Sequence, residues 1–244
     1  NMSKTILITG ATDGIGLETA KKLLQQGHTI LAHGRNEEKL NKLKKELATA
    51  GKIETYLADL RSKKAVLYLA KEIAKNHSSI NVLINNAAVL KTTDVVTTDG
   101  LDVRFVVNTL APYLLTKKLL PLLKGSGRVI NVASAAQAPV NFHALIGKIT
   151  GLTDMEAYSQ SKLALIMWCT TMSKIVDPNE TIFVSVNPGS LLGTKMVKEA
   201  FNIEGKSISI GADILVKLAI HYNSNTISGK YFDNDLNQFR IHHP

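Results

Sequence analysis

The sequence predicts one α/β domain over residues 1–244, built on a doubly wound parallel sheet of about seven strands with helices on both faces. Short runs rich in Val, Ile and Leu alternate with helical patterns of leucine along the whole chain. The runs are continuously apolar, as expected for strands buried on both faces. No composition break or internal repeat marks a second domain.

A glycine-rich turn joins the first strand to the first helix. The strand is expected at 4–9, the turn covers 10–16, and the amphipathic helix that follows ends at Gly27. Glycines let the backbone approach a pyrophosphate, and the helix N-terminus offers free N–H groups and a positive dipole end. A merely tight turn between strand and helix is the alternative. The candidate cofactor contacts in the turn are Gly10, Thr12, Asp13, Gly14, Ile15 and Gly16.

The second strand, expected at 28–32, is followed by basic and amide side chains and then by a helix over 40–47. In dinucleotide-binding folds an acidic residue near this point binds the adenosine ribose hydroxyls. Arg35 stands there instead, and its guanidinium suits a 2′-phosphate. Arg35 and Asn36 are therefore cofactor candidates, and we expect NADP(H) to be preferred over NAD(H), although Asp13 argues mildly for the reverse.

The third and fourth strands also end in candidate ligand-binding residues. A strand at 53–58 ends before Asp59, whose carboxylate suits an adenine amino group or, equally, the cap of a helix over 66–73. Asp59 and Leu60 are cofactor candidates. A strand at 81–84 ends in amides and small residues that suit a backbone packed closely on a ligand, with candidates Asn86, Ala87 and Ala88.

A long helix is expected over 101–123, with Asn108 inside it. Asn competes for backbone hydrogen bonds in a helix interior. Pro112 removes a backbone donor, so we expect a kink or a loosened turn. The amide of Asn108 would hold a water at this break, or would only satisfy the freed carbonyls.

The next elements carry three groups suited to acid–base chemistry. A strand at 128–132 ends before Ser134, at the sheet edge where open α/β sheets bind ligands. After a connection over 135–157, Tyr158 and Lys162 lie one helical turn apart. An ammonium beside a phenol favours the phenolate and lowers its pKa from about 10, which makes the phenol a usable proton donor and acceptor.

The rest of the chain supplies a second long connection. A strand at 181–186 is followed by an irregular apolar stretch over 190–206, a helix over 208–221 and an edge strand at 229–232. Long connections in compact domains are usually functional. We expect 135–157 and 190–206 to wall an apolar substrate pocket, although their apolar residues would equally suit core or a subunit contact. The candidate substrate contacts are Ser134, Ala136, Tyr158 and Leu191.

Taken together, these residues resemble the short-chain dehydrogenase/reductase family over nearly the whole chain, and most closely its retinol-dehydrogenase and oxidoreductase-like branch. Ala88 departs from the family signature, which has glycine there. The matching residues are Gly10, Gly14 and Gly16 in the cofactor loop, Asp59, Asn85 to Ala87, the catalytic set Asn108, Ser134, Tyr158 and Lys162, and Pro188 and Gly189 near the nicotinamide.

The resemblance implies a Rossmann fold that transfers a hydride between nicotinamide and the carbonyl or alcohol carbon of a small molecule. It implies that Tyr158 exchanges the proton with the substrate oxygen and that Ser134 donates a hydrogen bond to that oxygen. Lys162 would lower the pKa of Tyr158 and bind the nicotinamide ribose, and Asn108 would position a water. The family commonly forms homodimers or homotetramers. A non-catalytic NADP(H)-binding sensor on the same fold is the alternative.

Composition argues against other classes of protein. The net charge is +9, but the lysines concentrate in 37–52 and 63–75, interleaved with Glu at helical spacing and without alternating aromatic residues. We therefore expect no nucleic-acid partner, and binding to nucleic acid or a membrane surface is kept only as a rival. No apolar run reaches roughly 18 residues, so no membrane insertion is expected. The single cysteine and the absence of a secretory segment favour a cytoplasmic location, and the histidine spacing predicts no metal site.

Overall fold

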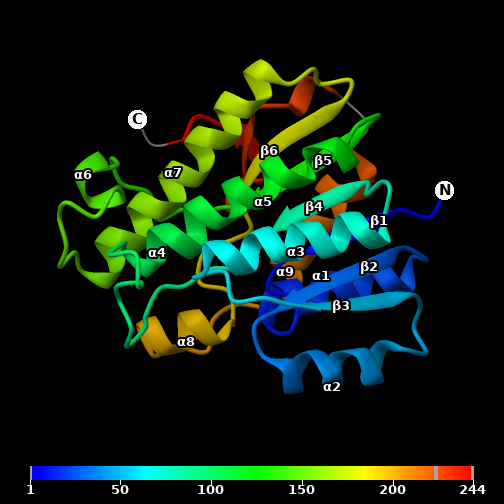
Figure 1. The fold of residues 1–244 in the computed structure, drawn as a ribbon, viewed down its shortest axis with the longest axis horizontal. Coiled ribbons are helices and arrows are strands. Elements are labelled where there is room, and N and C mark those ends of the chain that lie inside the picture. Colours follow the sequence, from blue (N-terminus) through cyan, green and yellow to red (C-terminus); the bar gives the residue numbers. More distant parts are fainter. Residues whose placement is uncertain (1, 223–224, 243–244) are drawn as a thin grey trace.

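The computed structural model describes residues 2–222 and 225–242; residues 1, 223–224 and 243–244 of the predicted domain lie outside this part. The described strands form one sheet in the order β3-β2-β1-β4-β5-β6-β7-β8 (Figure 1). Every neighbouring pair is parallel except β7–β8. The strands are β1 (Thr5–Ile8), β2 (Thr29–Gly34), β3 (Ile53–Leu57), β4 (Val82–Asn85), β5 (Gly127–Val132), β6 (Thr181–Asn187), β7 (Tyr231–Asp233) and β8 (Gln238–Arg240).

Helices cover both faces of the sheet because alternate strand side chains point to opposite faces. Ile6 and Ile8 of β1 lie in the core that packs against α1, α2 and α9, whereas Leu7 lies in the core beneath α3, α5 and α7. In Figure 1, α3 and α5 lie in front of the sheet and α1 and α9 behind it. The predicted fold class is therefore confirmed. These helices are α1 (Gly14–Gln25), α2 (Glu37–Leu47), α3 (Lys63–Asn76), α5 (Ala111–Leu119), α7 (Asp154–Ile175) and α9 (Ser209–Val216).

The C-terminal end of the sheet differs from the prediction of about seven strands ending in an edge strand at 229–232. β7 lies between β6 and an eighth strand, β8, which forms the antiparallel edge. β8 has only three residues and is largely exposed, so the sequence contains no apolar run that would predict it. Phe239 holds it in place through edge-to-face contact with Phe232, with ring centroids 5.0 Å apart.

The helix predicted over 101–123 is present but interrupted. It consists of α4 (Val103–Phe105), a wider π-helical turn η1 (Val106–Leu110), α5, and a 3-10 turn η2 (Leu120–Leu122). Pro112 lies in the first turn of α5, immediately after η1. The missing donor of proline and the wide turn coincide, so the predicted loosening is confirmed. It places Asn108 within the π turn.

The two long connections contain short helices that the sequence analysis left irregular. α6 (Phe142–Leu145) lies in the first connection and α8 (Lys195–Phe201) in the second. No residue of α8 is buried, so it carries no core-facing apolar stripe for a sequence pattern to reveal. The last described helical turns, η3 (Lys217–His221) and η4 (Asn225–Ile227), flank the end of α9 and the start of β7. Among the described residues, no helix combines the length and apolar character of a bilayer-crossing segment.

The strand order positions a ligand site. The chain proceeds outward from β1 through β2 to β3 and then returns to place β4 on the other side of β1. The connections after β1 and β4 therefore diverge and leave a crevice at the carboxyl ends of these strands. Open α/β sheets bind their ligands in such a crevice.

Candidate functional site

A cavity of about 500 Å³ lies at the carboxyl ends of the strands. It brings together most of the residues that the sequence analysis selected from separate segments. Three of them, Gly16, Asn36 and Asn108, do not line it. The predicted residues that do are Gly10, Thr12, Asp13, Gly14, Ile15, Arg35, Asp59, Leu60, Asn86, Ala87, Ala88, Ser134, Ala136, Tyr158, Lys162, Pro188, Gly189 and Leu191.

The glycine turn forms one end of this cavity and is fitted closely to the end of β4. Gly10 has a φ of +63°, and a Cβ there would lie 3.0 Å from the Cα of Ala87. At Gly16 a Cβ would lie 2.3 Å from the carbonyl oxygen of Gly10, so this glycine allows the turn to close rather than lining the cavity. The side-chain amide of Asn86 donates to the carbonyl of Gly10 at 3.2 Å. The turn and the end of β4 thus form one fixed wall.

Charged side chains surround the part of the cavity beside β2. Arg35 is exposed and lines it together with Lys39. The carboxylate of Asp13 accepts from the amide of Gly14 at 2.8 Å and lies 3.8 Å from the ammonium of Lys39, which offsets its charge. The side chain of Asn36 caps α2 by accepting from the amide of Lys39 at 2.9 Å, and so serves the helix rather than the cavity.

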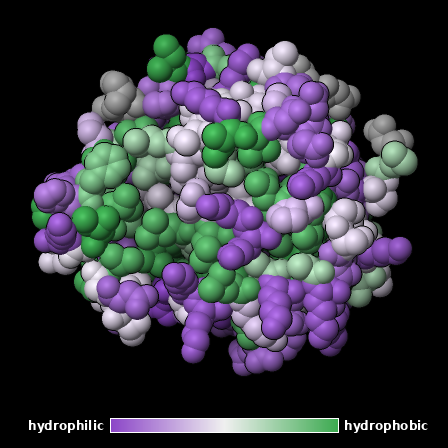
Figure 2. Space-filling view, turned by 45° about the horizontal axis from the view of Figure 1, so that its top comes forward, coloured by the Kyte–Doolittle hydropathy of each residue, from purple (hydrophilic) through white to green (hydrophobic). Residues whose placement is uncertain are grey.

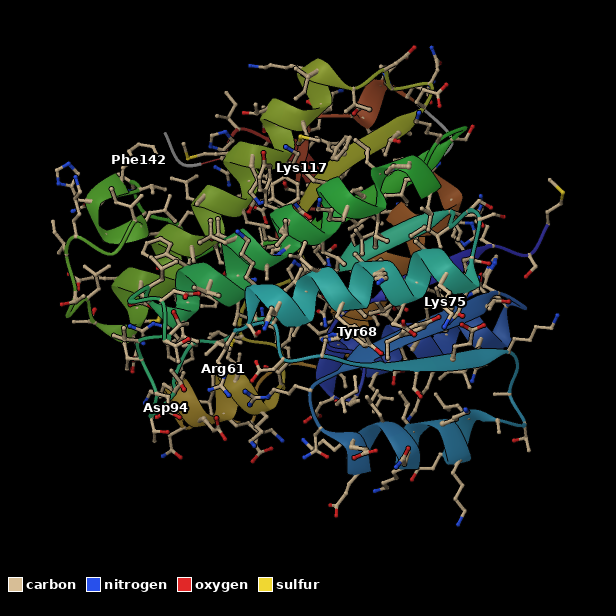
Figure 3. All side chains as sticks on the ribbon, viewed as in Figure 1. Arg61, Tyr68, Lys75, Asp94, Lys117 and Phe142 are labelled. Atoms are coloured by element: carbon tan, nitrogen blue, oxygen red, sulfur yellow. The ribbon has the colours of Figure 1, made fainter. Side chains whose placement is uncertain are left out.

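The carboxylate of Asp59 is paired with Arg61. It accepts from the backbone amide of Arg61 at 3.0 Å and from the guanidinium at 2.9 Å, and hydrogen bonding to Arg61 lowers the pKa of Asp59. Ser62, not Asp59, caps α3, so the alternative role of Asp59 as a helix cap is wrong. Arg61 also approaches Asp94 at 3.9 Å (Figure 3).

Ser134, Tyr158 and Lys162 converge beyond the end of β5. The side chain of Ser134 lies beside the hydroxyl of Tyr158 at the wall of the cavity. The ammonium of Lys162 lies 5.6 Å from the centroid of the Tyr158 ring and donates to the carbonyl of Val132 at 2.8 Å. Two hydroxyls and an ammonium, from α7 and the connection after β5, therefore meet at one wall of the cavity.

Burial governs the acid–base properties of this group in the protein alone. It raises the pKa of Tyr158, and the neighbouring Ser134 side chain offsets this only in part. Burial also lowers the pKa of Lys162 to about 7. In the protein alone the pKa of Tyr158 is therefore raised, the reverse of the predicted lowering, because the same loss of solvent that isolates the phenol also disfavours the neighbouring ammonium. Stabilisation of the phenolate by Lys162 stays a prediction.

Asn108 is buried and supports the site from behind. Its side chain accepts from the amide of Val89 at 2.8 Å and donates to the carbonyl of Val89 at 2.9 Å and to the hydroxyl of Ser161 at 3.0 Å. It therefore fixes the connection after β4 against α7. Its side-chain amide donates to Val89 and Ser161 and not to carbonyls of its own helix. Because Pro112 has no N–H, the backbone carbonyl of Asn108 lacks the donor that an α-helix would place four residues further along the chain.

The connection after β6 is held by residues that no sequence pattern indicates. Asn187, Ser190 and Asp235 meet there across a long stretch of chain. The carboxylate of Asp235 accepts from the amide of Ser190 at 2.9 Å and from the side chain of Asn187 at 2.9 Å, and the Ser190 hydroxyl also donates to it. Burial would raise the pKa of Asp235, but these bonds outweigh it and the pKa is lowered. Nothing in the local sequence of Asp235 indicates this role.

Asp235→Asn is expected to loosen the connection that carries Ser190 and Leu191. The amide keeps one acceptor but loses the oxygen that accepts from Asn187 and the Ser190 hydroxyl. Hydrogen bonds to charged groups contribute about 1.5–3 kcal/mol, so we expect the KM for a substrate to rise about tenfold. Steady-state kinetics would measure this rise, with the exposed Asp177→Asn as the matched control. An unchanged KM would contradict the role assigned to Asp235.

The remaining walls are apolar. Met155, Leu191, Met196 and Phe201 line the cavity from α7 and the 190–206 connection. At α6, Phe142 is 59% exposed and Ile146 is 55% exposed. Figure 2 shows hydrophobic residues gathered toward the left of the molecule, the side on which Figures 1 and 3 place α6 and Phe142. The described residues contain no group of His, Cys, Asp or Glu suited to a metal ion.

Comparisons with known proteins agree with this architecture. A family model described as short chain dehydrogenase matches residues 4–204. Retinol dehydrogenase 13 of Mus musculus is 31% identical and aligns over 94% of this chain and 75% of its own length. A Shigella flexneri short chain dehydrogenase, solved in complex with NADP, is 27% identical with a TM-score of 0.76, covering 95% and 97% of the two chains. NADPH-bound carbonyl reductase from chicken fatty liver is 22% identical with a TM-score of 0.78, covering 98% and 99%.

Proposed function

The chain belongs to the short-chain dehydrogenase family and is an NAD(P)-dependent dehydrogenase/reductase, and we propose that it transfers a hydride between NADP(H) and the carbonyl or alcohol carbon of an apolar small molecule. The observation that carries this proposal is the meeting of Ser134, Tyr158 and Lys162 in the cavity whose other end is the glycine turn. A protein that only binds a nucleotide needs the turn but has no need of these three side chains.

The residues present suit a nicotinamide dinucleotide. The cavity of about 500 Å³ extends from the glycine turn to Tyr158. The backbone of the turn and the N-terminus of α1 would take the pyrophosphate. Asp59 and Leu60 would flank the adenine, and Asn86 to Ala88 would lie along the cofactor. Lys162, Pro188 and Gly189 would hold the nicotinamide end.

The bound nicotinamide would supply or accept the hydride. In the reducing direction, the hydroxyl of Tyr158 gives its proton to the substrate oxygen. The hydroxyl of Ser134 donates a hydrogen bond to the same oxygen, where negative charge develops. The ammonium of Lys162 stabilises the phenolate that remains, and the backbone carbonyl of Asn108 holds a water through which the proton is replaced. The apolar walls exclude bulk water from these groups.

Arg35 supports a preference for NADP(H). Its guanidinium is exposed at the end of β2 and lines the cavity, where a 2′-phosphate would find a bidentate partner. Lys39 lies at the same wall and offsets the charge of Asp13. The Shigella flexneri relative solved with NADP agrees with this choice.

Arg35→Ala is expected to weaken NADPH binding about tenfold or more and to leave NADH binding nearly unchanged, because only NADPH carries the 2′-phosphate. Titration of the nicotinamide fluorescence would give both dissociation constants. Lys71→Ala removes an exposed positive charge outside the cavity and is the control for a general effect of charge. An equal loss for both cofactors would contradict the preference.

Consumption of NADPH in the presence of aldehydes and ketones tests the proposed reaction directly. The apolar walls favour carbonyls with apolar substituents over charged ones. We expect turnover with members of an apolar panel, and Lys195 at the cavity wall keeps acidic carbonyl compounds in the screen. Tight NADPH binding without turnover of any compound would favour the sensor. Retention on DNA or anionic lipid, unaffected by NADPH, would favour the rival in which the positive charge binds nucleic acid or a membrane surface.

Self-association through the helices around Asn108 and Tyr158 is part of the proposal. α5 and α7 carry the Tyr113–Trp168 ring pair, with centroids 5.6 Å apart, and Met167 is 38% exposed beside it. Exposed apolar surface of this kind suits a contact between copies. Sedimentation equilibrium would distinguish a homodimer or homotetramer from a monomer. The cytoplasmic location stays a prediction.

A further inference from the structure

His33 joins three segments of the cofactor site although the proposed reaction does not use it. It lies at the end of β2, only 2% exposed, and lines the cavity. Its Nδ1 accepts a hydrogen bond from the backbone amide of Gly10 at 3.1 Å. Its Nε2 lies 2.8 Å from the carbonyl oxygen of Ala58, at the end of β3. Its own backbone carbonyl accepts from the amide of Ala11 at 2.9 Å.

These contacts permit only one form of the imidazole. A carbonyl oxygen can only accept, so Nε2 must carry a proton to bond Ala58. A backbone amide can only donate, so Nδ1 must carry none to bond Gly10. The contacts thus require the neutral ring with its proton on Nε2. A second proton on Nδ1 would turn the contact with Gly10 into two N–H groups facing each other.

The glycine turn depends on this contact because of its backbone conformation. Gly10 lies at a φ of +63° directly against Ala87, and the amides of Gly10 and Ala11 are both bound by His33. Two consecutive N–H groups of the turn are thereby oriented by one residue. A turn without the imidazole acceptor would leave a partly buried amide unpaired, which favours other turn conformations.

We propose that His33 is a positioning residue for the cofactor, which holds the glycine turn in its binding conformation only as the neutral Nε2-protonated imidazole. This inference rests on the proposed function, because it takes the turn to be the pyrophosphate site. It adds that acid should release the turn and weaken cofactor binding through a residue that need not touch the cofactor.

The surroundings of His33 agree with a neutral ring. Burial lowers its pKa from the ordinary value of 6.5, against the opposing effects of the Ala58 carbonyl and of Asp59. Asp59 is itself paired with Arg61, which reduces its pull on a proton. The other charged groups at this wall are Asp13 on the turn, Arg35 after β2 and Lys39 on α2. The neutral form therefore prevails at pH 7 and gives way only in acid.

Two substitutions separate the contacts of the ring. In His33→Asn the side-chain oxygen stands near the place of Nδ1, keeps an acceptor for Gly10 and cannot be protonated in this range. In His33→Gln the amide nitrogen reaches the place of Nε2 and keeps the donor for Ala58, but the acceptor for Gly10 is lost. Cofactor binding is measured by NADPH fluorescence from pH 8 down to the lowest pH at which the proteins stay folded. Hydrogen exchange of the amides in residues 9–14 is measured without cofactor, corrected for the intrinsic effect of pH.

At pH 8, His33→Gln should bind NADPH about tenfold more weakly than His33→Asn, which should stay close to wild type. Amide protection in the turn should fall in the Gln variant and persist in the Asn variant. Between pH 8 and the lowest pH at which both proteins stay folded, the wild type should lose more affinity and more protection than His33→Asn. Titration of the 2′-phosphate affects both proteins alike, so it cancels in this comparison.

Equal turn protection and equal affinity in the two variants would overturn the inference. So would an identical pH response of the wild type and His33→Asn. If a variant fails to fold, the wild-type protein still decides the matter: as the pH falls to the lowest value at which it stays folded, the turn should lose amide protection relative to the core strands. Failure of the wild type to bind NADPH, with the exchange difference intact, would count against the proposed function and leave the role of His33 in the turn standing.

Discussion

Tyr158→Phe is expected to lower kcat/KM for carbonyl reduction by about 10³-fold or more while changing the dissociation constant of NADPH by less than about threefold. The substitution removes the one hydroxyl that is placed to give a proton to the substrate oxygen. It keeps the ring, so the packing of α7 and the position of Lys162 are preserved. Stopped-flow kinetics and fluorescence titration would measure the two effects separately.

The control for this prediction is Tyr68→Phe, which removes a phenol that is 60% exposed on α3, outside the cavity. It should leave both constants unchanged. Because burial raises the pKa of Tyr158, the phenol is protonated at neutral pH and ready to act as an acid. Retained turnover in purified Tyr158→Phe would remove Tyr158 from the proton-transfer role and with it the proposed mechanism.

Lys162→Met is expected to reduce turnover by a similar factor, about 10³-fold, and in addition to change how stability depends on pH. The substitution removes the charge that stabilises the phenolate and keeps most of the apolar volume. The wild-type kcat/KM for reduction should decline as pH rises through about 7, since the pKa of Lys162 is lowered to about 7 and its charge is lost above that value. The variant should lack this decline.

The effect on stability follows from the same pKa. Unfolded Lys162 titrates near its ordinary pKa of 10.5 and folded Lys162 near about 7. Between these values the unfolded state binds more protons, so the free energy of unfolding rises with pH. Relative to Lys162→Met, the wild type should therefore gain stability as pH increases from 7 to 10, measured by chemical denaturation. Lys174→Met, at the exposed end of the same helix, should show no such trend. A constant difference between wild type and Lys162→Met would contradict the lowered pKa.

The sequence was most informative where structure follows from local pattern. Continuous apolar runs located six of the strands to within one or two residues, because burial on both faces leaves an unmistakable run of Val, Ile and Leu. β8 was not predicted, because a short exposed edge strand has no such run. α8 was not predicted, because a helix without buried residues has no apolar stripe at helical spacing. Pro112 correctly indicated a loosened helix, since the missing donor is a property of that residue alone.

The site shows the same division. Glycines, amides and hydroxyls at strand ends could be selected from the sequence, because a parallel sheet brings the carboxyl ends of its strands to one edge. The hydrogen bonds from Ser190 to Asp235 and from Gly10 to His33 could not be predicted from the sequence. Their partners lie 45 and 23 residues apart and meet only through the order of strands in the sheet.

By itself, the sequence determined the strands, the glycine turn and which polar side chains would stand at the strand ends, since these depend on hydrogen bonding and burial over a few neighbouring residues. Only the tertiary structure decided the direction in which the pKa of Tyr158 shifts, the neutral state of His33 and the hydrogen-bond partners of Asn108. Each of these depends on how much water the surrounding elements exclude and on which distant backbone groups they bring within hydrogen-bonding reach. A pattern of residue types along the chain does not contain either quantity.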